Sequence, residues 1–304
     1  VRKLEFLLAH ARSRGAETLI TFGGIGSNHA LATTIHGAAA GLKTVSCMVP
    51  QPVSADVKRN ILVGHHFGEE FRVVEKPPEL VVNSLEKFAR ELVDRGRAPY
   101  IVPPGGSSLR GAAGYVNAAF ELKKQIDSGA APEPDCIFVP VGTCGTAAGL
   151  HLGCDVAGLK CRVVGVRVTD WYFGNPFNLA AMATALSLKL HSMDRSFPAK
   201  FYGPKDVFFE NDFFGGEYGR YTAEGMEAVE LMKEKAGMKL EGVYTGKTMA
   251  GLVSAGRKGE LDGMKVLYWH TFNSVNLSHY ADMHDYRELP DFMQQYFEME
   301  EQKI

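Results

Sequence analysis

The sequence predicts an α/β protein with a mostly parallel sheet, because short apolar runs alternate with amphipathic helical segments along its 304 residues. One run, 136–141, is apolar throughout, as expected of a strand buried on both faces of such a sheet. Glycine-rich loops follow three of the predicted strands, at 23–29, 103–108 and 142–149. Because no low-complexity linker interrupts the alternation, we expect two domains packed closely around a shared cleft.

The predicted elements follow one another in a regular order. Strands are expected at 17–22, 44–49, 71–74, 100–102, 136–141, 162–168 and 264–270. Helices are expected at 1–11, from 27, at 56–64, 81–92 and 115–126, after the loop at 142–149, at 179–190 and 223–235, and from 248. Between 191 and 220 the sequence is aromatic and glycine-rich, and a long loop is expected there, which in a compact protein usually serves function.

The composition excludes several classes of protein. Lys and Arg number 33 against 35 Asp and Glu, so a net charge of −2 leaves no basic surface for nucleic acid or anionic membranes. No stretch approaches the roughly 18 uninterrupted apolar residues that a membrane helix needs. The five cysteines form no Cys-x-x-Cys pair, which favours reduced thiols in the cytoplasm. Since His65, His66 and His270 lack other ligands nearby, no metal is predicted.

The first residues, VRKLEFLLAHA, already predict a helix. Leu4, Leu7 and Leu8 recur at helical spacing, and Ala11 continues the same face. Since a mature chain rarely begins inside an element, and the start carries no signal-peptide pattern, we expect further residues upstream of Val1.

The loop at 142–149 is a candidate phosphate site. Its glycines let the backbone approach a ligand, its N–H groups can form an anion nest, and the helix that follows favours negative charge. Thr143 and Thr146 add hydroxyl donors. The loop lacks both the Lys-Ser/Thr ending of a nucleoside-triphosphate loop and the spacing of a dinucleotide fingerprint. A tight turn between strand and helix is the alternative interpretation.

The other two glycine-rich loops are more ambiguous. In the loop at 23–29, Ser27 could simply cap the next helix. Asn28 and His29 are not explained by a cap, and the Ser-Asn-His run offers a hydroxyl, an amide and an imidazole to one cleft. In the loop at 103–108, turn chemistry alone is the favoured interpretation.

Taken together, these segments resemble a family of pyridoxal 5'-phosphate (PLP) enzymes. The family comprises D-cysteine desulfhydrase and 1-aminocyclopropane-1-carboxylate (ACC) deaminase, which have the tryptophan-synthase-β fold (fold type II). From Val1 to Thr271, the segments that resemble its motifs are VRKLEFLLA, GGIGSNHA, PPGGSSLRGAAGYVNAAFEL, GTCGTAAGL, FFGGEYG, VYTGKTMAGL and KVLYWHT. Their common order, over nearly the whole chain, makes the resemblance specific.

The resemblance implies an architecture and a reaction. It implies two open, twisted, mostly parallel sheets flanked by helices, with PLP in the cleft between a small domain (10–117) and a large one (1–9 and 118–304). In such a homodimer, a lysine immediately before Val1 would form the Schiff base and abstract the α-proton of a small amino acid. Loss of a β-substituent would then release pyruvate and ammonia, with the cofactor as electron sink.

Specific roles are implied residue by residue. Lys3 and the loop backbone would hold the phosphate, Asn28 would face the phenolic oxygen of the pyridine ring, and Thr271 would lie near its nitrogen. Ser27 and His29 would hold the substrate carboxylate, with Ser27 also a candidate for proton transfer. Tyr218 and Tyr244 would flank the substrate as catalytic residues, although each could equally be a packing aromatic. The implied cofactor-binding residues are Lys3, Asn28, Gly142, Thr143, Cys144, Gly145, Thr146 and Thr271, with the Cys144 side chain expected to be a small filler.

Two departures from the family pattern concern the substrate. Phe272 and Asn273 stand where the family usually has Gly-Gly, so a smaller pocket and weak activity on D-cysteine and ACC are expected. Leu31 stands where the family usually has arginine after the Ser-Asn-His run, which removes a cation. Three alternatives stay open. They are a β-replacing synthase of the same fold, a non-catalytic PLP-binding protein, and an α/β enzyme that uses the loop at 142–149 for another phosphate.

Overall fold

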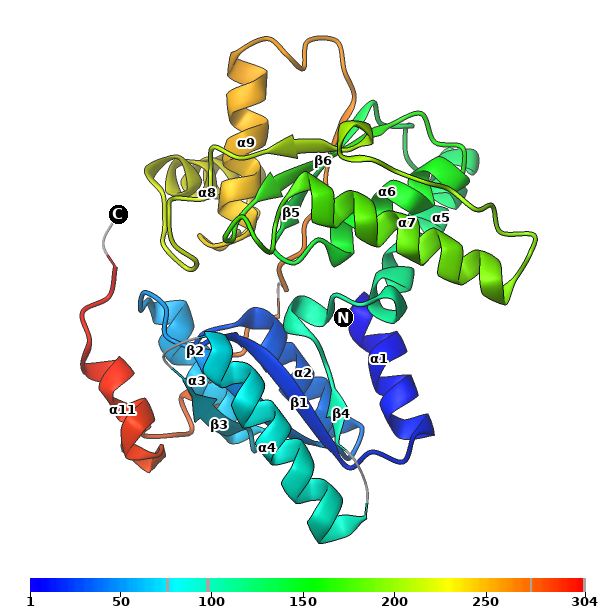
Figure 1. Ribbon diagram of the computed structural model, residues 1–304. Coiled ribbons are helices and arrows are strands. Elements are labelled where there is room, and N and C mark those ends of the chain that lie inside the picture. Colours follow the sequence, from blue (N-terminus) through cyan, green and yellow to red (C-terminus); the bar gives the residue numbers. More distant parts are fainter. Residues whose placement is uncertain (75–76, 97–98, 274, 303–304) are drawn as a thin grey trace. The chain divides into compact units, whose positions relative to one another are not determined.

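The computed structural model describes residues 1–74, 77–96, 99–273 and 275–302 (Figure 1). The chain forms two compact units. The first contains Val1, most of the chain from Lys3 to Gly106, and the C-terminal segment from Val275. The second contains Arg2 and most of the chain from Ser107 onward to that segment. These units differ from the expected domain ranges, because residues 3–9 and the C-terminal segment both pack in the first unit.

The first unit is built on a parallel sheet with the strand order β3-β2-β1-β4. Its strands are β1 (Thr18–Gly24), β2 (Lys43–Val49), β3 (Glu70–Val73) and β4 (Tyr100–Ile101). Its helices are α1 (Arg2–Ser13), α2 (Asn28–Ala39), α3 (Ala55–His66), α4 (Pro77–Arg95), α10 (Ser278–Ala281) and α11 (Asp291–Glu298). The apolar face predicted for α1 is buried in one core cluster with Leu19 and Val102. Of the side chains that predicted α4, those of Val81, Leu85 and Leu92 lie outside the described residues.

The second unit contains another parallel sheet, with the order β7-β6-β5-β8. Its strands are β5 (Cys136–Val141), β6 (Arg162–Arg167), β7 (Phe208–Glu210) and β8 (Val266–Tyr268). Its helices are α5 (Leu109–Asp127), α6 (Gly145–Val156), α7 (Pro176–Met193), α8 (Ala223–Ala236) and α9 (Thr245–Arg257). Every residue of β5 is buried, as the apolar run predicted. The α/β class and the two parallel sheets are therefore confirmed.

Several boundaries differ from the sequence prediction, and two of the differences have a clear physical cause. The stretch 191–220 is not loop throughout, because β7 lies within it and pairs with β6 from Val164 to Val166. Three residues at a sheet edge are too few to show a strand period. Helix α9 begins at Thr245 rather than Thr248, because Glu241 accepts hydrogen bonds from the backbone of the first turn.

The strand order explains where the glycine-rich loops lie. In the first sheet the chain moves outward from β1 to β3 and then returns to the other side of β1 as β4. In the second sheet it moves outward from β5 to β7 and returns beside β5 as β8. Ligands of parallel sheets bind at the carboxyl ends of strands where the order reverses. The strands at these reversal points are β1, β4, β5 and β8. Each is followed by one of the predicted site segments, namely the loops at 23–29, 103–108 and 142–149 and Thr271.

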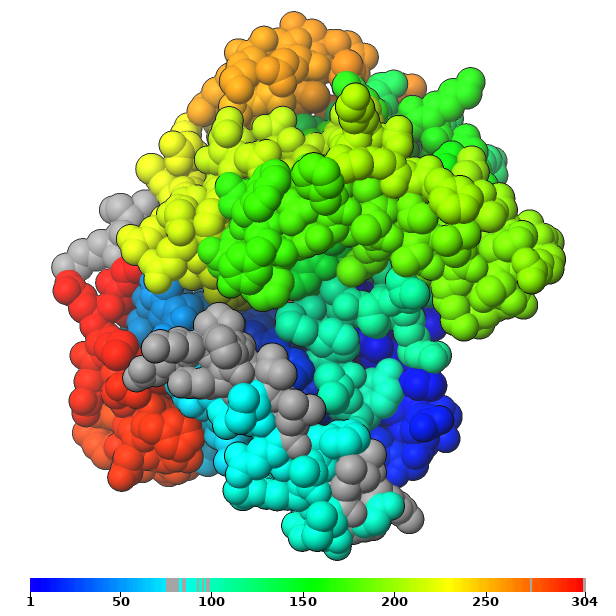
Figure 2. Space-filling model, in the orientation of Figure 1, coloured from blue at the N-terminus to red at the C-terminus, as the bar shows by residue number. Residues whose placement is uncertain are grey.

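No helix within the described ranges is long and apolar enough to cross a membrane. The segment between β6 and α7, green in Figure 2, lies at the surface of the second unit. It exposes an aromatic cluster that consists of Trp171, Tyr172 and Phe173, with Phe177 in the first turn of α7.

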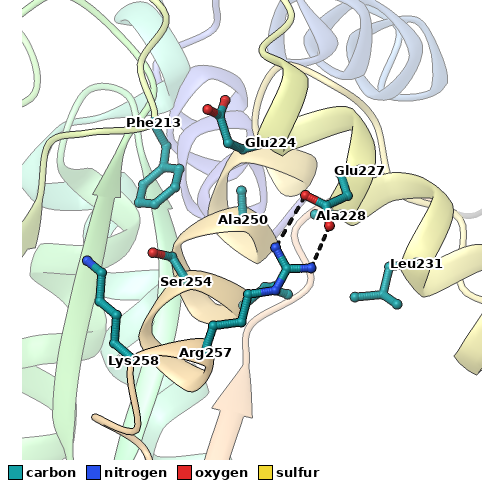
Figure 3. A pocket seen from close by; sticks show the side chains of 10 residues that line it. Phe213, Glu224, Glu227, Ala228, Leu231, Ala250, Ser254, Arg257 and Lys258 are labelled. Carbon is teal, nitrogen blue, oxygen red and sulfur yellow. Dashed lines mark hydrogen bonds and ion pairs between the residues drawn. The ribbon is translucent and has the colours of Figure 1, made fainter.

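Helices α8 and α9 enclose a cavity of about 300 Å³ (Figure 3). Its lining includes Phe213, Ala250 and the ion pair between Glu227 and Arg257, which Figure 3 shows spanning the two helices. None of the site residues predicted from the sequence lines it. This cavity is therefore separate from the candidate site.

Glu69 is a buried carboxyl between α3 and β3, with 7% of its surface exposed. A Cβ on Gly64 would lie 2.0 Å from Glu69 Oε2, so a larger residue there would force the carboxyl to move. Burial raises the pKa of Glu69 from 4.5 to about 7, against the opposing effect of the Ser46 and Thr34 hydroxyls.

This raised pKa predicts a pH-dependent stability. The folded state favours the protonated form, so the stabilisation is complete below pH 4.5 and is lost as the pH rises through about 7. Across that window the free energy of unfolding is expected to fall by about 3 kcal/mol from this group. Urea denaturation of wild type and Glu69→Gln checks this, because glutamine keeps the shape and does not ionise. Equal pH slopes in both proteins would contradict the assignment.

Candidate functional site

The loop between β5 and α6 has the backbone of an anion site. Cys144, which precedes the first residue of α6, is held at φ 64°, and among the described residues it is the only non-glycine with positive φ. Right-handed residues follow it directly in α6. A left-handed residue followed by right-handed ones turns successive backbone N–H groups toward one point, and the helix N-terminus adds its positive dipole. The strained conformation at a helix start favours a binding role over a simple turn.

Ser107 completes this loop from the neighbouring glycine-rich segment. Its Oγ lies 2.7 Å from Thr143 Oγ1 and accepts a hydrogen bond from the Gly145 N–H at 3.2 Å. A Cβ on Gly145 would lie only 2.5 Å from the same oxygen, so only glycine permits this approach. The segment 103–108 thus does more than form a turn, and sequence reasoning missed Ser107 because the contact joins residues far apart in the chain.

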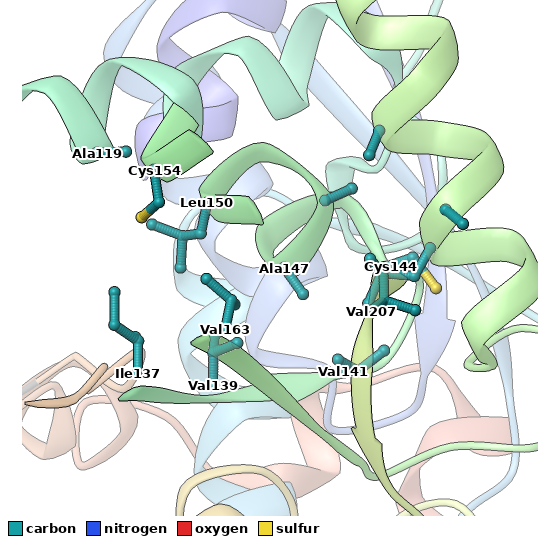
Figure 4. Close-up of a cluster of buried hydrophobic side chains, with 14 of the residues drawn as sticks. Ala119, Ile137, Val139, Val141, Cys144, Ala147, Leu150, Cys154, Val163 and Val207 are labelled. Carbon is teal, nitrogen blue, oxygen red and sulfur yellow. The ribbon is translucent and has the colours of Figure 1, made fainter. Parts of the chain in front are cut away.

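The Cys144 side chain points into the core of the second unit. Figure 4 shows it beside Val141 and Val207, and the residue is 2% exposed. Its thiol donates to the Phe173 carbonyl at 3.4 Å. Burial raises the pKa of the thiol to about 11. At neutral pH the Cys144 side chain is therefore an uncharged thiol packed in the core. Only the backbone of Cys144 contributes to the shape of the candidate anion site.

Tyr218 and Tyr244 form a hydroxyl pair in the second unit. Their oxygens lie 2.9 Å apart and their rings meet edge to face. A Cβ on Gly142 would be 3.4 Å from Tyr244 Cε1, so this ring lies against the loop between β5 and α6. Burial, followed by the nearness of Tyr218, raises the pKa of Tyr244 well above its usual value. Both predicted tyrosines are therefore brought together beside the candidate phosphate loop, with Tyr244 protonated at neutral pH.

Two buried ionisable side chains hold this pair in place. Glu241 accepts backbone hydrogen bonds from Val243, Tyr244 and Thr245 at 2.9, 2.8 and 2.7 Å. Lys247 is 0% exposed, and its Nζ donates to the Phe214 carbonyl at 2.5 Å. Glu241 thereby fixes the backbone of Tyr244, while Lys247 anchors the segment that leads to Tyr218. Lys247 lies within the VYTGKTMAGL segment and Glu241 just before it, yet nothing in their spacing indicated these contacts.

In the first unit, Ser27 caps helix α2. Its Oγ accepts from the Ala30 N–H at 3.3 Å, as the cap interpretation expected. A Cβ on Gly23 would lie 2.6 Å from the same oxygen, so the glycine makes room for the cap. Because the cap uses a lone pair of the oxygen, the hydroxyl proton stays available to a ligand.

Asn28 is oriented by a neighbour that the sequence did not indicate. Asn60 Nδ2 donates to Asn28 Oδ1 at 2.9 Å and to the Gly26 carbonyl at 2.9 Å. With its oxygen engaged, Asn28 presents its amide N–H₂ as a donor. A donor at this position suits the phenolic oxygen that the resemblance implies as its partner.

His29 has a buried ring nitrogen that lacks a partner. Its Nε2 makes no hydrogen bond with any described residue, while the ring bonds to the Pro103 carbonyl. Burial, and then the charge of Lys3, lowers the pKa of His29 to about 3, so the ring is neutral. A neutral ring that donates to Pro103 leaves Nε2 as an acceptor. This arrangement suits a ligand O–H or N–H group and does not suit the carboxylate expected from the resemblance.

The remaining predicted residues differ in exposure. Burial lowers the pKa of Lys3 to about 8, which keeps much of its positive charge at neutral pH. Thr146 lies in the first turn of α6, where its hydroxyl meets that of Tyr115. Thr271 is exposed after the end of β8, and Phe272 beside it is half-buried.

Comparisons with known proteins agree with this geometry. The sequence family described as pyridoxal-phosphate dependent enzyme matches residues 1–271. A Pyrococcus horikoshii protein, named as a candidate ACC deaminase, is 34% identical over 283 residues, which are 93% of this chain and 82% of that protein. A D-cysteine desulfhydrase of Klebsiella pneumoniae is 32% identical over 276 residues, covering 89% of this chain and 80% of its own length. The crystal structure of an ACC deaminase homologue matches with a TM-score of 0.75 and 34% identity, over 93% of this chain and 82% of that one.

The chain therefore belongs to the pyridoxal-phosphate dependent enzymes, and PLP is its cofactor. Within them it is a fold type II enzyme related to the ACC deaminases and D-cysteine desulfhydrases, as the sequence resemblance implied. The residues present fit the cofactor. The loop before α6 combines the left-handed Cys144 with a helix N-terminus, an arrangement that suits a phosphate.

Thr146→Ala tests the phosphate loop. Loss of one hydroxyl contact of about 1–1.5 kcal/mol is expected to weaken PLP binding roughly tenfold. Spectroscopic titration of the apoprotein with PLP measures this. Thr184→Ala is the control, because that hydroxyl donates to the Tyr202 carbonyl and not to the loop. Equal affinities in wild type and Thr146→Ala would mean that the phosphate binds elsewhere.

Proposed function

We propose that the protein is a PLP-dependent lyase that removes a β-substituent from a small amino acid and releases a 2-oxo acid, such as pyruvate, and ammonia. The names of the relatives support this class of reaction. The observation that carries the proposal is the tyrosine pair against Gly142, because it brings transferable protons to the loop proposed to hold the phosphate. PLP, when bound, supplies an electron sink for the carbanion.

The protein's own residues would bind the substrate and move protons around it. Tyr244 is protonated at neutral pH, and Tyr218 can replace a proton that Tyr244 Oη gives to a leaving group. The Ser27 hydroxyl would donate to the substrate carboxylate, and the amide of Asn28 to the ring oxygen of the cofactor. His29 Nε2 would accept from a protonated group of cofactor or substrate. Lys3 and the backbone of residues 142–146 would hold the phosphate, and Thr271 would lie near the pyridine nitrogen.

Phe272 is proposed to set the substrate. We expect weak pyruvate release from D-cysteine and from ACC by wild type, because a phenyl group occupies volume that glycine leaves open in relatives. Phe272→Gly is expected to raise D-cysteine turnover about tenfold or more, since even one methylene of mismatch costs about 1–3 kcal/mol. Assays of pyruvate release from small D- and L-amino acids measure both the wild-type activity and the gain in the variant. The exposed Phe201, changed to glycine, is the matched control.

The outcome separates the candidates. Strong wild-type turnover of D-cysteine, unchanged in Phe272→Gly, would show that Phe272 does not restrict the substrate. Absence of pyruvate from every amino acid tested, in protein that holds PLP, would contradict the lyase assignment itself. In that case, product formation only when a second nucleophile is added would identify a β-replacing synthase.

We also propose that the enzyme is a homodimer in the cytoplasm. The exposed aromatic cluster at the start of α7 supports a partner of the same chain, since large exposed apolar patches mark interfaces. The free cysteines support a reducing compartment. Light scattering of the purified protein measures the oligomeric state, and a monomer at micromolar concentration would contradict the first proposal.

A further inference from the structure

The C-terminal segment of the first unit, orange to red in Figure 1, packs on helix α3. Leu289 and Met293 share one core cluster with Ile61 of that helix. This packing brings His284 and Glu288 to the end of α3, where His65 and His66 lie. The prediction that these two histidines lack metal-ligand neighbours is therefore wrong, because the neighbours come from a segment more than two hundred residues away.

Three ligand atoms converge at this point. His284 Nδ1 lies 2.9 Å from Glu288 Oε2, and His65 Nε2 lies 3.8 Å from the same oxygen. One atom from each of the three residues falls within 4.8 Å of the other two. Around zinc, ligand atoms at about 2.0–2.2 Å from the ion are roughly 3–3.6 Å from one another. The separations in the structure, from 2.9 Å to at most 4.8 Å, bracket that spacing.

His66 contacts the ring of His284 and can hold it in position. Its Nδ1 lies 3.0 Å from His284 Nε2, the ring nitrogen that does not face Glu288. Histidines that bind metal through one nitrogen usually hold the other in a hydrogen bond, which fixes the tautomer and the ring orientation. This second contact is independent of the three convergent atoms and points to a ligand between them.

We propose that His65, His284 and Glu288 bind a divalent transition-metal ion of the zinc type, with His66 as the positioning residue for His284. Two imidazoles and a carboxylate suit zinc and its neighbours, whereas magnesium and calcium prefer oxygen ligands alone. Three protein ligands leave a fourth position for water. The bound ion would join the C-terminal segment to α3, and none of these residues belongs to the proposed PLP site.

The test is calorimetric titration of the PLP-loaded, chelator-treated full chain with zinc chloride. It is done in a Cys161→Ser background, because Cys161 is the least buried thiol. One zinc per chain is expected, with magnesium chloride giving no binding. His284→Ala and Glu288→Gln should abolish the site, and His66→Gln should weaken it about 10–100-fold. His279→Gln is the control, since that ring lies tilted against Tyr280 and is not one of the proposed ligands.

Two results would overturn the proposal. One is the absence of stoichiometric zinc binding to the starting protein. The other is binding of unchanged affinity in both His284→Ala and Glu288→Gln, with folding verified by circular dichroism. Because Glu288 is exposed, its variant tests the site even if His284→Ala fails to fold. Neither result bears on pyruvate release, so the metal site and the proposed lyase activity stand or fall separately.

Discussion

Tyr244→Phe is expected to lower turnover of the preferred amino acid by about 10²–10⁴-fold, the usual contribution of a positioned general acid or base. The substitution removes the hydroxyl that pairs with Tyr218 and leaves the ring against Gly142. PLP binding should therefore change little, and kcat should fall much more than KM changes. Steady-state pyruvate assays with PLP-saturated protein measure the effect.

Tyr268→Phe is the matched control for this variant. Its hydroxyl donates to the Thr245 carbonyl at 2.9 Å, so it supports the same helix without belonging to the tyrosine pair. Its removal should cost about 1 kcal/mol of stability and leave kcat nearly unchanged. Equal kcat in Tyr244→Phe and wild type would show that the pair is packing, which was the alternative interpretation of both tyrosines.

Glu241→Ala is expected to reduce the free energy of unfolding by about 3–5 kcal/mol. The substitution removes the acceptor of three backbone N–H groups, those of Val243, Tyr244 and Thr245. Each buried donor left without an acceptor costs about 1–3 kcal/mol. Because the same contacts fix the backbone of Tyr244, turnover should fall even below the unfolding transition. Urea denaturation and pyruvate release measure the two effects.

Glu227→Ala is the control for charge removal in the same pair of helices. Glu227 is exposed and meets Arg257 across the cavity between α8 and α9, where solvent screens the pair. The Glu227→Ala substitution should therefore leave both stability and turnover nearly unchanged. A similarly small effect of Glu241→Ala would contradict the view that the cap holds the start of α9 and Tyr244.

The parts of the fold that could be predicted share a strong local signal. The run 136–141 is apolar at every position, and β5 has those bounds. The α1 stripe of Leu4 and Leu7 repeats at helical spacing and is buried. The three-residue strand β7 offers no period, so only its pairing with β6 defines it. The start of α9 was missed for a related reason, since it depends on the tertiary position of the Glu241 carboxylate.

The candidate site divides in the same way. Glycine-rich loops after strands predicted the α6 start and the Ser27 cap, because these features are local. Ser107 and Asn60, which orient the loop and Asn28, act across 38 and 32 residues of sequence. His284 reaches His66 across 218 residues, so the histidine cluster had no local signal at all. Single-sequence patterns indicate which residues bear chemistry, and only the packed structure shows which neighbours set their orientation and protonation.

A crystal structure of the protein with PLP tests the central claim most directly. The account predicts the phosphate at the amino end of α6, hydrogen-bonded to backbone N–H groups within residues 142–146, with the Tyr244 hydroxyl beside the cofactor. A phosphate bound at another helix start, such as that of α2 or α9, would contradict it.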